Sequence, residues 1–141
     1  MKFTVEVEVN RPADVVFGHI ADNRNEPIWN TRISKVEMTS PEPVGKGSTF
    51  LSTNRGTQSL VTLAEYNRPE SLSYSVRGKE MDIDARVRVD SKSPDTAVVT
   101  AEYNLMSKGF FKVVLPLMAP MLRKAFSGEL KNFKSFSEAQ K

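Results

Sequence analysis

Cysteine is absent from the 141-residue sequence, and histidine and tryptophan each occur only once, as His19 and Trp29. Without cysteine the chain forms neither disulfides nor thiolate ligands, and this composition is typical of a protein of the reducing cytoplasm. A single histidine without cysteine also argues against a zinc site. We therefore predict a cytoplasmic protein with no metal and no cofactor.

Long apolar runs are absent as well. No uninterrupted apolar segment approaches the roughly 20 residues that span a bilayer, so we expect no stable membrane insertion. The first nine residues alternate and contain Glu6 and Glu8, which is unlike a signal or transit peptide. The 20 Lys and Arg residues exceed the 17 Asp and Glu residues by a net charge of +3, and they are spread along the chain. Because nucleic-acid binding needs a clustered basic face, no DNA partner is expected.

The most regular pattern present is a helical one, from Lys108 to Phe136. Apolar residues recur there at the 3.6-residue period and predict one long amphipathic helix with one face turned to a core. Pro116 and Pro120 lie in its first half, so that either the helix is kinked or its true start lies near Leu117. The predicted inward stripe comprises Phe111, Leu115, Met118, Leu122, Ala125, Phe126, Leu130, Phe133 and Phe136.

The rest of the chain consists mainly of short segments in which apolar and polar residues alternate, as in half-buried strands. After the first strand, Asn10 offers an N-cap oxygen, and Pro12 near the first turn predicts the start of a short helix that ends near Asp22. A second short helical segment is expected at about 23–29, with Pro27 as an interruption. Turn signals separate the later segments, among them Asn54-Arg55-Gly56 as a hairpin turn. The predicted strands are 3–9, 33–38, 48–53, 58–66, 72–76, 81–90 and 96–106.

These elements predict a single α+β domain over residues 1–141. Hairpin-length connections make consecutive strands antiparallel neighbours, and only the C-terminal helix is long enough to cover the apolar face of the sheet. We expect a curved seven-stranded antiparallel sheet wrapped around the long C-terminal helix, with two short helices between strands 1 and 2. A curved sheet and a rod do not fill space completely, so a cavity is expected between them.

The sequence resembles the helix-grip superfamily that includes START domains, birch-pollen-allergen-like proteins and bacterial polyketide cyclase/dehydrase-like proteins. The resemblance covers essentially the whole chain and implies a seven-stranded antiparallel sheet with a tunnel for a small apolar molecule. This fold hosts several different functions, so the resemblance alone does not select one. The segments that carry it are 5–17, 20–22 with Pro27 and Trp29, 44–47, 65–69 with Leu72, and 119–126.

The residues expected to contact a ligand are those on the apolar sheet face and the inward helix stripe. Trp29 is either a contact at the cavity mouth or a structural plug whose indole nitrogen finds a backbone partner. Met118 and Met121 would suit a pliable wall, with core packing as the alternative. The predicted ligand-binding residues are Trp29, Phe50, Leu63, Tyr74, Ile83, Ala85, Val87, Val99, Ala101, Tyr103, Met118, Met121, Leu122 and Phe126.

Three residues could carry proton-transfer chemistry. Glu129 lies at the centre of the inward helix stripe, where a buried carboxylate needs a partner or a raised pKa, unless the end of the helix projects into solvent. Tyr103 has apolar neighbours on its strand face and offers a phenol, either to a ligand or to the edge of the sheet. His19 has no nearby Ser, Asp or Glu spacing that suggests a triad. Glu129 and Tyr103 are therefore the catalytic candidates.

Three functions are compatible with this pattern. The first is binding or transport of a small hydrophobic or aromatic ligand, lipid or polyketide-like, by a monomer or homodimer. The second is a polyketide cyclase, aromatase or dehydrase that uses acid and base groups in the pocket. The third, which ranks last, is a toxin-like or ribosome-associated protein that binds RNA through the basic side of the last helix.

Overall fold

The computed structural model describes residues 1–140 and contains one sheet with its helices on one face. The strands β2 to β7 follow one another as antiparallel neighbours, and the order across the seven-stranded sheet is β1-β7-β6-β5-β4-β3-β2. The first strand therefore pairs with the last, as the register of Val5 opposite Ala101 shows. The strands are β1 (Lys2–Val9), β2 (Ile33–Met38), β3 (Thr49–Asn54), β4 (Thr57–Asn67), β5 (Ser71–Arg77), β6 (Met81–Ser93) and β7 (Thr96–Ser107). The predicted seven-stranded antiparallel sheet is confirmed.

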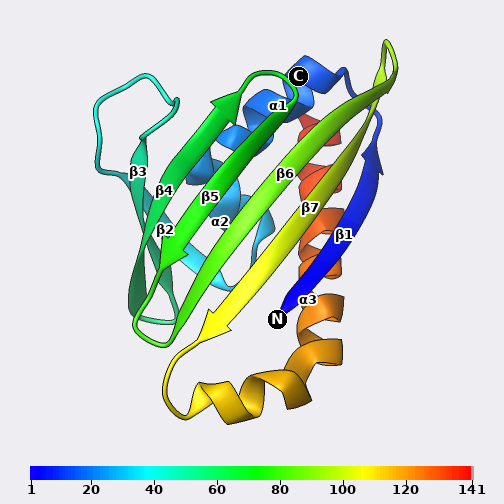
Figure 1. Ribbon diagram of the computed structural model, residues 1–141. Helices are drawn as coiled ribbons and strands as arrows, with labels where there is room; N and C mark the ends of the chain where they lie inside the picture. The colour runs from blue at the N-terminus through cyan, green and yellow to red at the C-terminus, as the bar shows by residue number, and fades with distance from the viewer. Residues whose placement is uncertain (141) are drawn as a thin grey trace.

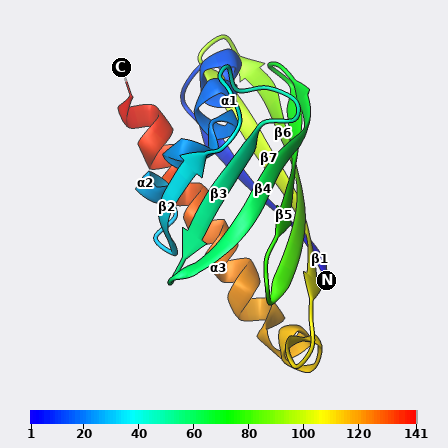
Figure 2. The same ribbon diagram turned by 90° about the vertical axis from the view of Figure 1, so that its left-hand side faces the viewer.

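The strand faces divide by polarity as the alternation indicates. On β6, Val87 and Val89 are buried, whereas Arg86 and Arg88, which alternate with them, are exposed. The apolar face is the inner face, which the helices cover (Figure 2). The hairpin turn between β3 and β4 uses Arg55 at φ 50° and Gly56 at φ 82°, which is the left-handed pair that a tight two-residue hairpin requires.

Two short helices connect β1 to β2. They are α1 (Ala13–Ala21) and α2 (Glu26–Trp29), joined by a 3₁₀ turn over Asn23–Asn25. The prediction that Asn10 caps α1 is wrong, because Pro12 occupies the N-cap position and no side chain caps the helix. The backbone N–H of Asn10 instead donates to Glu138 at 2.7 Å. Pro27 does not interrupt α2, since it lies in the first turn, where a missing N–H costs nothing.

The C-terminal helix α3 runs from Phe111 to Ala139 and contains both prolines. It therefore begins upstream of Leu117, and of the two alternatives the bent helix is correct. Figure 1 shows the first part of α3 crossing beyond the end of the sheet and the later part running beside β1. Each proline removes a backbone donor and displaces the preceding turn, which is the usual cause of such a bend.

The core is continuous along the sheet and the later part of α3. Phe126, Leu130 and Phe133 are buried there, as the inward stripe predicts. Beside the end of α3, Val16 and Phe17 of α1 are fully buried against the same cluster. None of the helices within residues 1–140 is long and apolar enough to cross a membrane.

Candidate binding cavity between the sheet and the long helix

A cavity of about 380 Å³ lies between the inner sheet face and α3. Its walls come from β3, β4, β5, β6 and β7 on one side and from α2 and α3 on the other. The cavity is also lined by residues of the β3–β4 turn, of the β5–β6 turn and by Phe111 at the start of α3. These segments lie together at the end of the sheet away from α1 (Figure 1). We take this end as the mouth of the cavity.

Many of the predicted ligand-binding residues line this cavity. On the sheet side Ala85 lies between two tyrosines, paired with Tyr74 of β5 and Tyr103 of β7. The predicted residues found in the lining are Trp29, Tyr74, Ile83, Ala85, Val87, Tyr103, Leu122 and Phe126. Their place in the lining keeps them as candidates for ligand contact.

Other predicted residues lie elsewhere. Met121 is 59% exposed, because it lies outside the inward stripe of α3 that contains Met118 and Leu122. Met118 is partly buried but does not line the cavity either. The fully buried positions outside the lining are Phe50, Leu63, Val99 and Ala101. Leu63, Val99 and Ala101 belong to the core cluster that also contains the α1 residues Val16 and Phe17.

Glu129 lies inside the cavity wall and is not solvated, so the alternative of a helix end projecting into solvent is wrong. Its side chain is 13% exposed and forms an ion pair with Arg32, whose Nε lies 2.7 Å from Oε1. Nη2 of Arg32 also donates to Oε2 at 3.1 Å. The Arg32 guanidinium stands 4.8 Å from the centroid of the Phe126 ring, a cation–π distance. Burial raises the pKa of Glu129, while the charge and hydrogen bond of Arg32 oppose the rise.

Glu26, at the start of α2, is a second carboxyl group of the lining that the sequence analysis did not identify. It accepts hydrogen bonds from Asn23 Nδ2 at 2.8 Å and from Asn30 Nδ2 at 3.3 Å. Burial, with a further contribution from the charge of Glu129, raises the pKa of Glu26 to about 7, against the amide hydrogen bonds and Arg32. Arg32 is thus paired with Glu129, and its charge also acts on Glu26 at this polar corner. A helix of four residues shows no hydrophobic period, so the sequence carried no clear signal for Glu26.

The two tyrosines differ in what their hydroxyls do. The Tyr74 hydroxyl reaches the last carbonyls of α1, Ile20 O at 2.7 Å and Ala21 O at 3.0 Å, so it anchors that helix to the sheet. No hydrogen bond among residues 1–140 involves the Tyr103 hydroxyl, while its ring packs edge-on against Phe126 at 4.8 Å between centroids. Burial raises the pKa of Tyr103, so this phenol stays protonated at neutral pH. Of these two tyrosines, Tyr103 is the one whose hydroxyl is available for a hydrogen bond to a ligand.

The remaining two candidates have structural surroundings. His19 Nδ1 lies 2.8 Å from the Ser137 hydroxyl, outside the cavity lining, and burial lowers the pKa of His19 with a further effect of Arg11. Trp29 lines the cavity and packs against Phe133 at 5.5 Å between ring centroids. The expected backbone partner of its indole nitrogen is not found, since Nε1 is buried without a hydrogen bond within residues 1–140.

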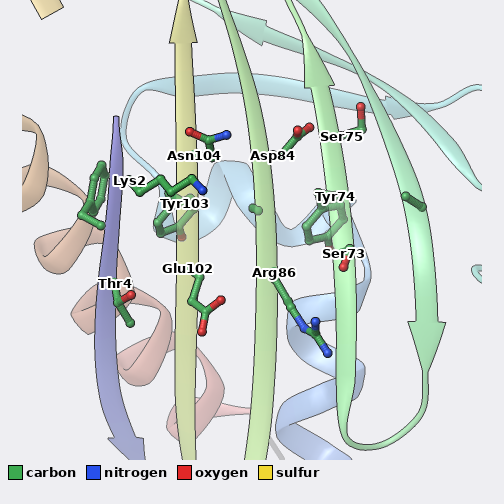
Figure 3. Close-up of a pocket in the computed structure, with 13 residues that line it drawn as sticks. Lys2, Thr4, Ser73, Tyr74, Ser75, Asp84, Arg86, Glu102, Tyr103 and Asn104 are labelled. Carbon is green, nitrogen blue, oxygen red and sulfur yellow. The ribbon is translucent and has the colours of Figure 1, made fainter.

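A second depression, of about 520 Å³, lies on the opposite face of the sheet across β1, β7, β6 and β5 (Figure 3). Figure 3 shows its charged and polar side chains, among them Asp84, Arg86 and Glu102. This depression is larger but more open to solvent than the cavity under α3. Ligand sites are usually concave and enclose most of the ligand, so the inner cavity, which is the less open of the two, is the stronger candidate.

The raised pKa of Glu26 predicts a difference in pH dependence between the wild type and Glu26→Gln. A carboxyl group whose folded pKa is above its unfolded value of 4.5 stabilises the fold fully below that value, and the contribution is lost as the pH rises through about 7. Urea unfolding at pH 5 and pH 8 measures this effect. Between these two pH values, the free energy of unfolding of Glu26→Gln should rise by up to about 3 kcal/mol relative to that of the wild type.

The matched control is Glu70→Gln, on an exposed turn residue, which should show no such gain. A Glu26→Gln difference that is the same at both pH values, within about 0.5 kcal/mol, would contradict the burial of an ionisable Glu26.

Several solved structures share this fold. A conserved protein from Geobacillus kaustophilus is 8% identical with a TM-score of 0.77, and the match covers 97% of this chain and 95% of that chain. A START superfamily protein from Mycobacterium smegmatis is 18% identical with a TM-score of 0.66, over 92% and 97%. Ara h 8.0201 is 12% identical with a TM-score of 0.71, over 99% of both chains. At these identities the likeness shows the fold, and it confirms the helix-grip architecture.

The sequence itself gives the family. No curated protein matches the chain. A family described as "Polyketide cyclase / dehydrase and lipid transport" matches residues 1–138, which include every element from β1 nearly to the end of α3. The sheet curved around α3 and the cavity between them agree with this match. The chain therefore belongs to this family of polyketide cyclases, dehydrases and lipid-transport proteins.

Proposed function

We propose that the protein binds a small hydrophobic or aromatic molecule in the cavity under α3 and carries it without changing it. The observation that carries the proposal is the shape and lining of that cavity. Its volume of about 380 Å³ falls in the range of small-molecule sites, and most of its walls are apolar or aromatic. The family and the fold also fit a hydrophobic ligand.

The polar corner supports a ligand with one polar end. Arg32, Glu129 and Glu26 lie together on the α2 and α3 side, while Val76 and Ile83 line the opposite wall. A few placed polar groups in an apolar pocket orient a ligand without supplying most of its affinity. A molecule with a ring or short chain and one oxygen function matches this division.

Native mass spectrometry with 1-naphthol and with glycerol as probes tests the proposal. We expect the intact protein to form a one-to-one adduct with 1-naphthol and none with glycerol, because burial of apolar ligand surface in the cavity lowers the free energy of binding. Organic extraction of the purified protein should release an apolar compound when the cavity is already occupied. An empty protein that also forms no adduct with naphthol or with a fatty alcohol would refute the binding role.

Glu26 favours a second candidate, an enzyme of the cyclase, aromatase or dehydrase type. A general acid or base works best when its pKa is near the working pH, and Glu26 meets this condition inside the cavity. The Tyr103 phenol lies in the same lining and could donate a proton to a ligand oxygen. Turnover of a poly-carbonyl substrate that falls more than about a hundredfold in Glu26→Gln would establish this candidate. Equal turnover in both proteins would exclude Glu26 from the reaction.

The interaction-protein alternative stays a prediction. Arg123, Lys124 and Lys131 are exposed on α3, but Lys134 is paired with Glu138. No DNA or RNA contact is part of the function we propose.

A further inference from the structure

Large exposed apolar side chains gather at the start of α3. Within residues 1–140 these side chains are Ile28, Leu60, Phe110, Phe111, Val113, Leu117 and Met121, so that five of seven fall between residues 110 and 121. Phe110 is 77% exposed, Val113 71% and Leu117 81%. At the helical period, residues 110, 113, 117 and 121 lie within about 80° of one another, so they form one stripe. We call Phe110, Val113, Leu117 and Met121 the apolar stripe.

The charged residues of the chain segment that contains the apolar stripe have one sign, and the nearest acidic residues, Glu80 and Asp82, belong to the adjoining β5–β6 region. Between Glu102 and Glu129 the sequence contains no Asp or Glu, but it contains Lys108, Lys112, Arg123 and Lys124. Lys108 forms an ion pair with Asp82 at 3.0 Å, which leaves Lys112, Arg123 and Lys124 on the exposed surface. A helix with exposed apolar residues beside cations is the form that binds in the interface of an anionic bilayer.

The apolar stripe also borders the cavity mouth. Phe111 and Leu122 of the same segment line the cavity, together with Lys79 and Met81 at the β5–β6 turn. Figures 1 and 2 show this part of α3 protruding beyond the end of the sheet, at the end opposite α1. A bilayer surface at this end of the molecule would therefore contact the apolar stripe and the cavity mouth at the same time.

We propose that the apolar stripe docks peripherally on the surface of a lipid bilayer that contains anionic lipids, with the cavity mouth facing the bilayer. An anionic surface explains both the apolar side chains and the acid-free segment around them. A second copy of the chain fits less well, because a two-fold contact on this surface would bring Lys112, Arg123 and Lys124 close to the same cations of the partner. The docking does not depend on which ligand the cavity holds.

Flotation of the full chain with lipid vesicles tests the proposal. Vesicles of phosphatidylcholine and phosphatidylglycerol in a three-to-one ratio should carry the wild type, whereas vesicles of phosphatidylcholine alone should carry at least about tenfold less. The double variant Val113→Ser/Leu117→Ser should bind the mixed vesicles at least about tenfold more weakly, because two inserted apolar side chains are lost. Both residues are exposed, so circular dichroism and the melting temperature should be unchanged.

Matched controls come from the two exposed apolar residues elsewhere. Ile28→Ser/Leu60→Ser removes the same kind of surface and should float like the wild type. The charge variant Lys112→Glu/Lys124→Glu should lose binding to the mixed vesicles and keep its fold. Equal flotation of the wild type and Val113→Ser/Leu117→Ser would overturn the proposal. The proposal would also be overturned if the wild type did not bind vesicles but formed a dimer in light scattering, and if Val113→Ser/Leu117→Ser were a monomer.

Discussion

Replacing Ala85 with phenylalanine should weaken the binding of a neutral aromatic probe such as 1-naphthol at least about a hundredfold, a change of about 2.7 kcal/mol. Ala85 lines the cavity between Tyr74 and Tyr103, and only 8% of it is exposed. Ala85 alternates with the exposed Arg86 and shares the inner face with Val87, so a phenyl ring added there would occupy space that a ligand would fill. Fluorescence titration of the wild type and Ala85→Phe gives the two dissociation constants.

The control for this prediction is Ala64→Phe, which places the same ring in the outer depression on β4. It should bind the probe like the wild type. Overpacking costs about 1–3 kcal/mol of stability, so thermal melts of both variants must show that they are folded at the temperature of the titration. If Ala64→Phe loses the probe and Ala85→Phe keeps it, the ligand site is the outer depression and the account of the inner cavity fails.

Truncation of Phe133 to alanine should lower the free energy of unfolding by about 3–5 kcal/mol. Its ring is fully buried and packs against Trp29 at 5.5 Å and Phe136 at 6.3 Å between centroids, which joins α3 to α2. The melting temperature should fall by about 10 °C for a chain of this size. Urea unfolding at pH 7 measures the change directly.

Phe110→Ala is the matched control, because the same side chain on the same segment is 77% exposed. It should change the free energy of unfolding by less than about 0.5 kcal/mol. A loss below about 1 kcal/mol for Phe133→Ala would mean that the later part of α3 does not form the core that the structure describes.

The architecture could be predicted because it depends on periodicity. The period of two along β6 and the 3.6-residue period of α3 assign a buried face to each residue, and burial of Val87, Val89 and Phe133 follows these assignments. Local signals were less reliable at helix starts. Asn10 has the right side chain for a cap, but its backbone N–H is taken by Glu138, 128 residues away, and sequence spacing carries no information on such a contact.

The candidate site was predictable only where it uses those same faces. Ala85, Tyr103 and Phe126 are inward by period and line the cavity. Periodicity does not say which part of an inner face is hollow. Val99 and Ala101 lie on that face and are fully buried, but they do not line the cavity.

The polar corner was missed for a different reason. Arg32 lies in a turn and Glu26 in a four-residue helix, where no period exists, and the Arg32–Glu129 pair joins positions 97 residues apart. Glu129 on an apolar stripe signals that a cation must lie near, but the sequence does not say which one.

Intermolecular nuclear Overhauser effects between bound 1-naphthol and the methyl groups of the protein test the inner cavity most directly. We expect cross-peaks from the ring protons to the methyl groups of Val76, Ile83, Ala85 and Leu122, all of which line the cavity. Cross-peaks confined to the exposed methyl groups of Val113 and Leu117, or to Ala64 on the opposite face, would show that the cavity under α3 is not the binding site.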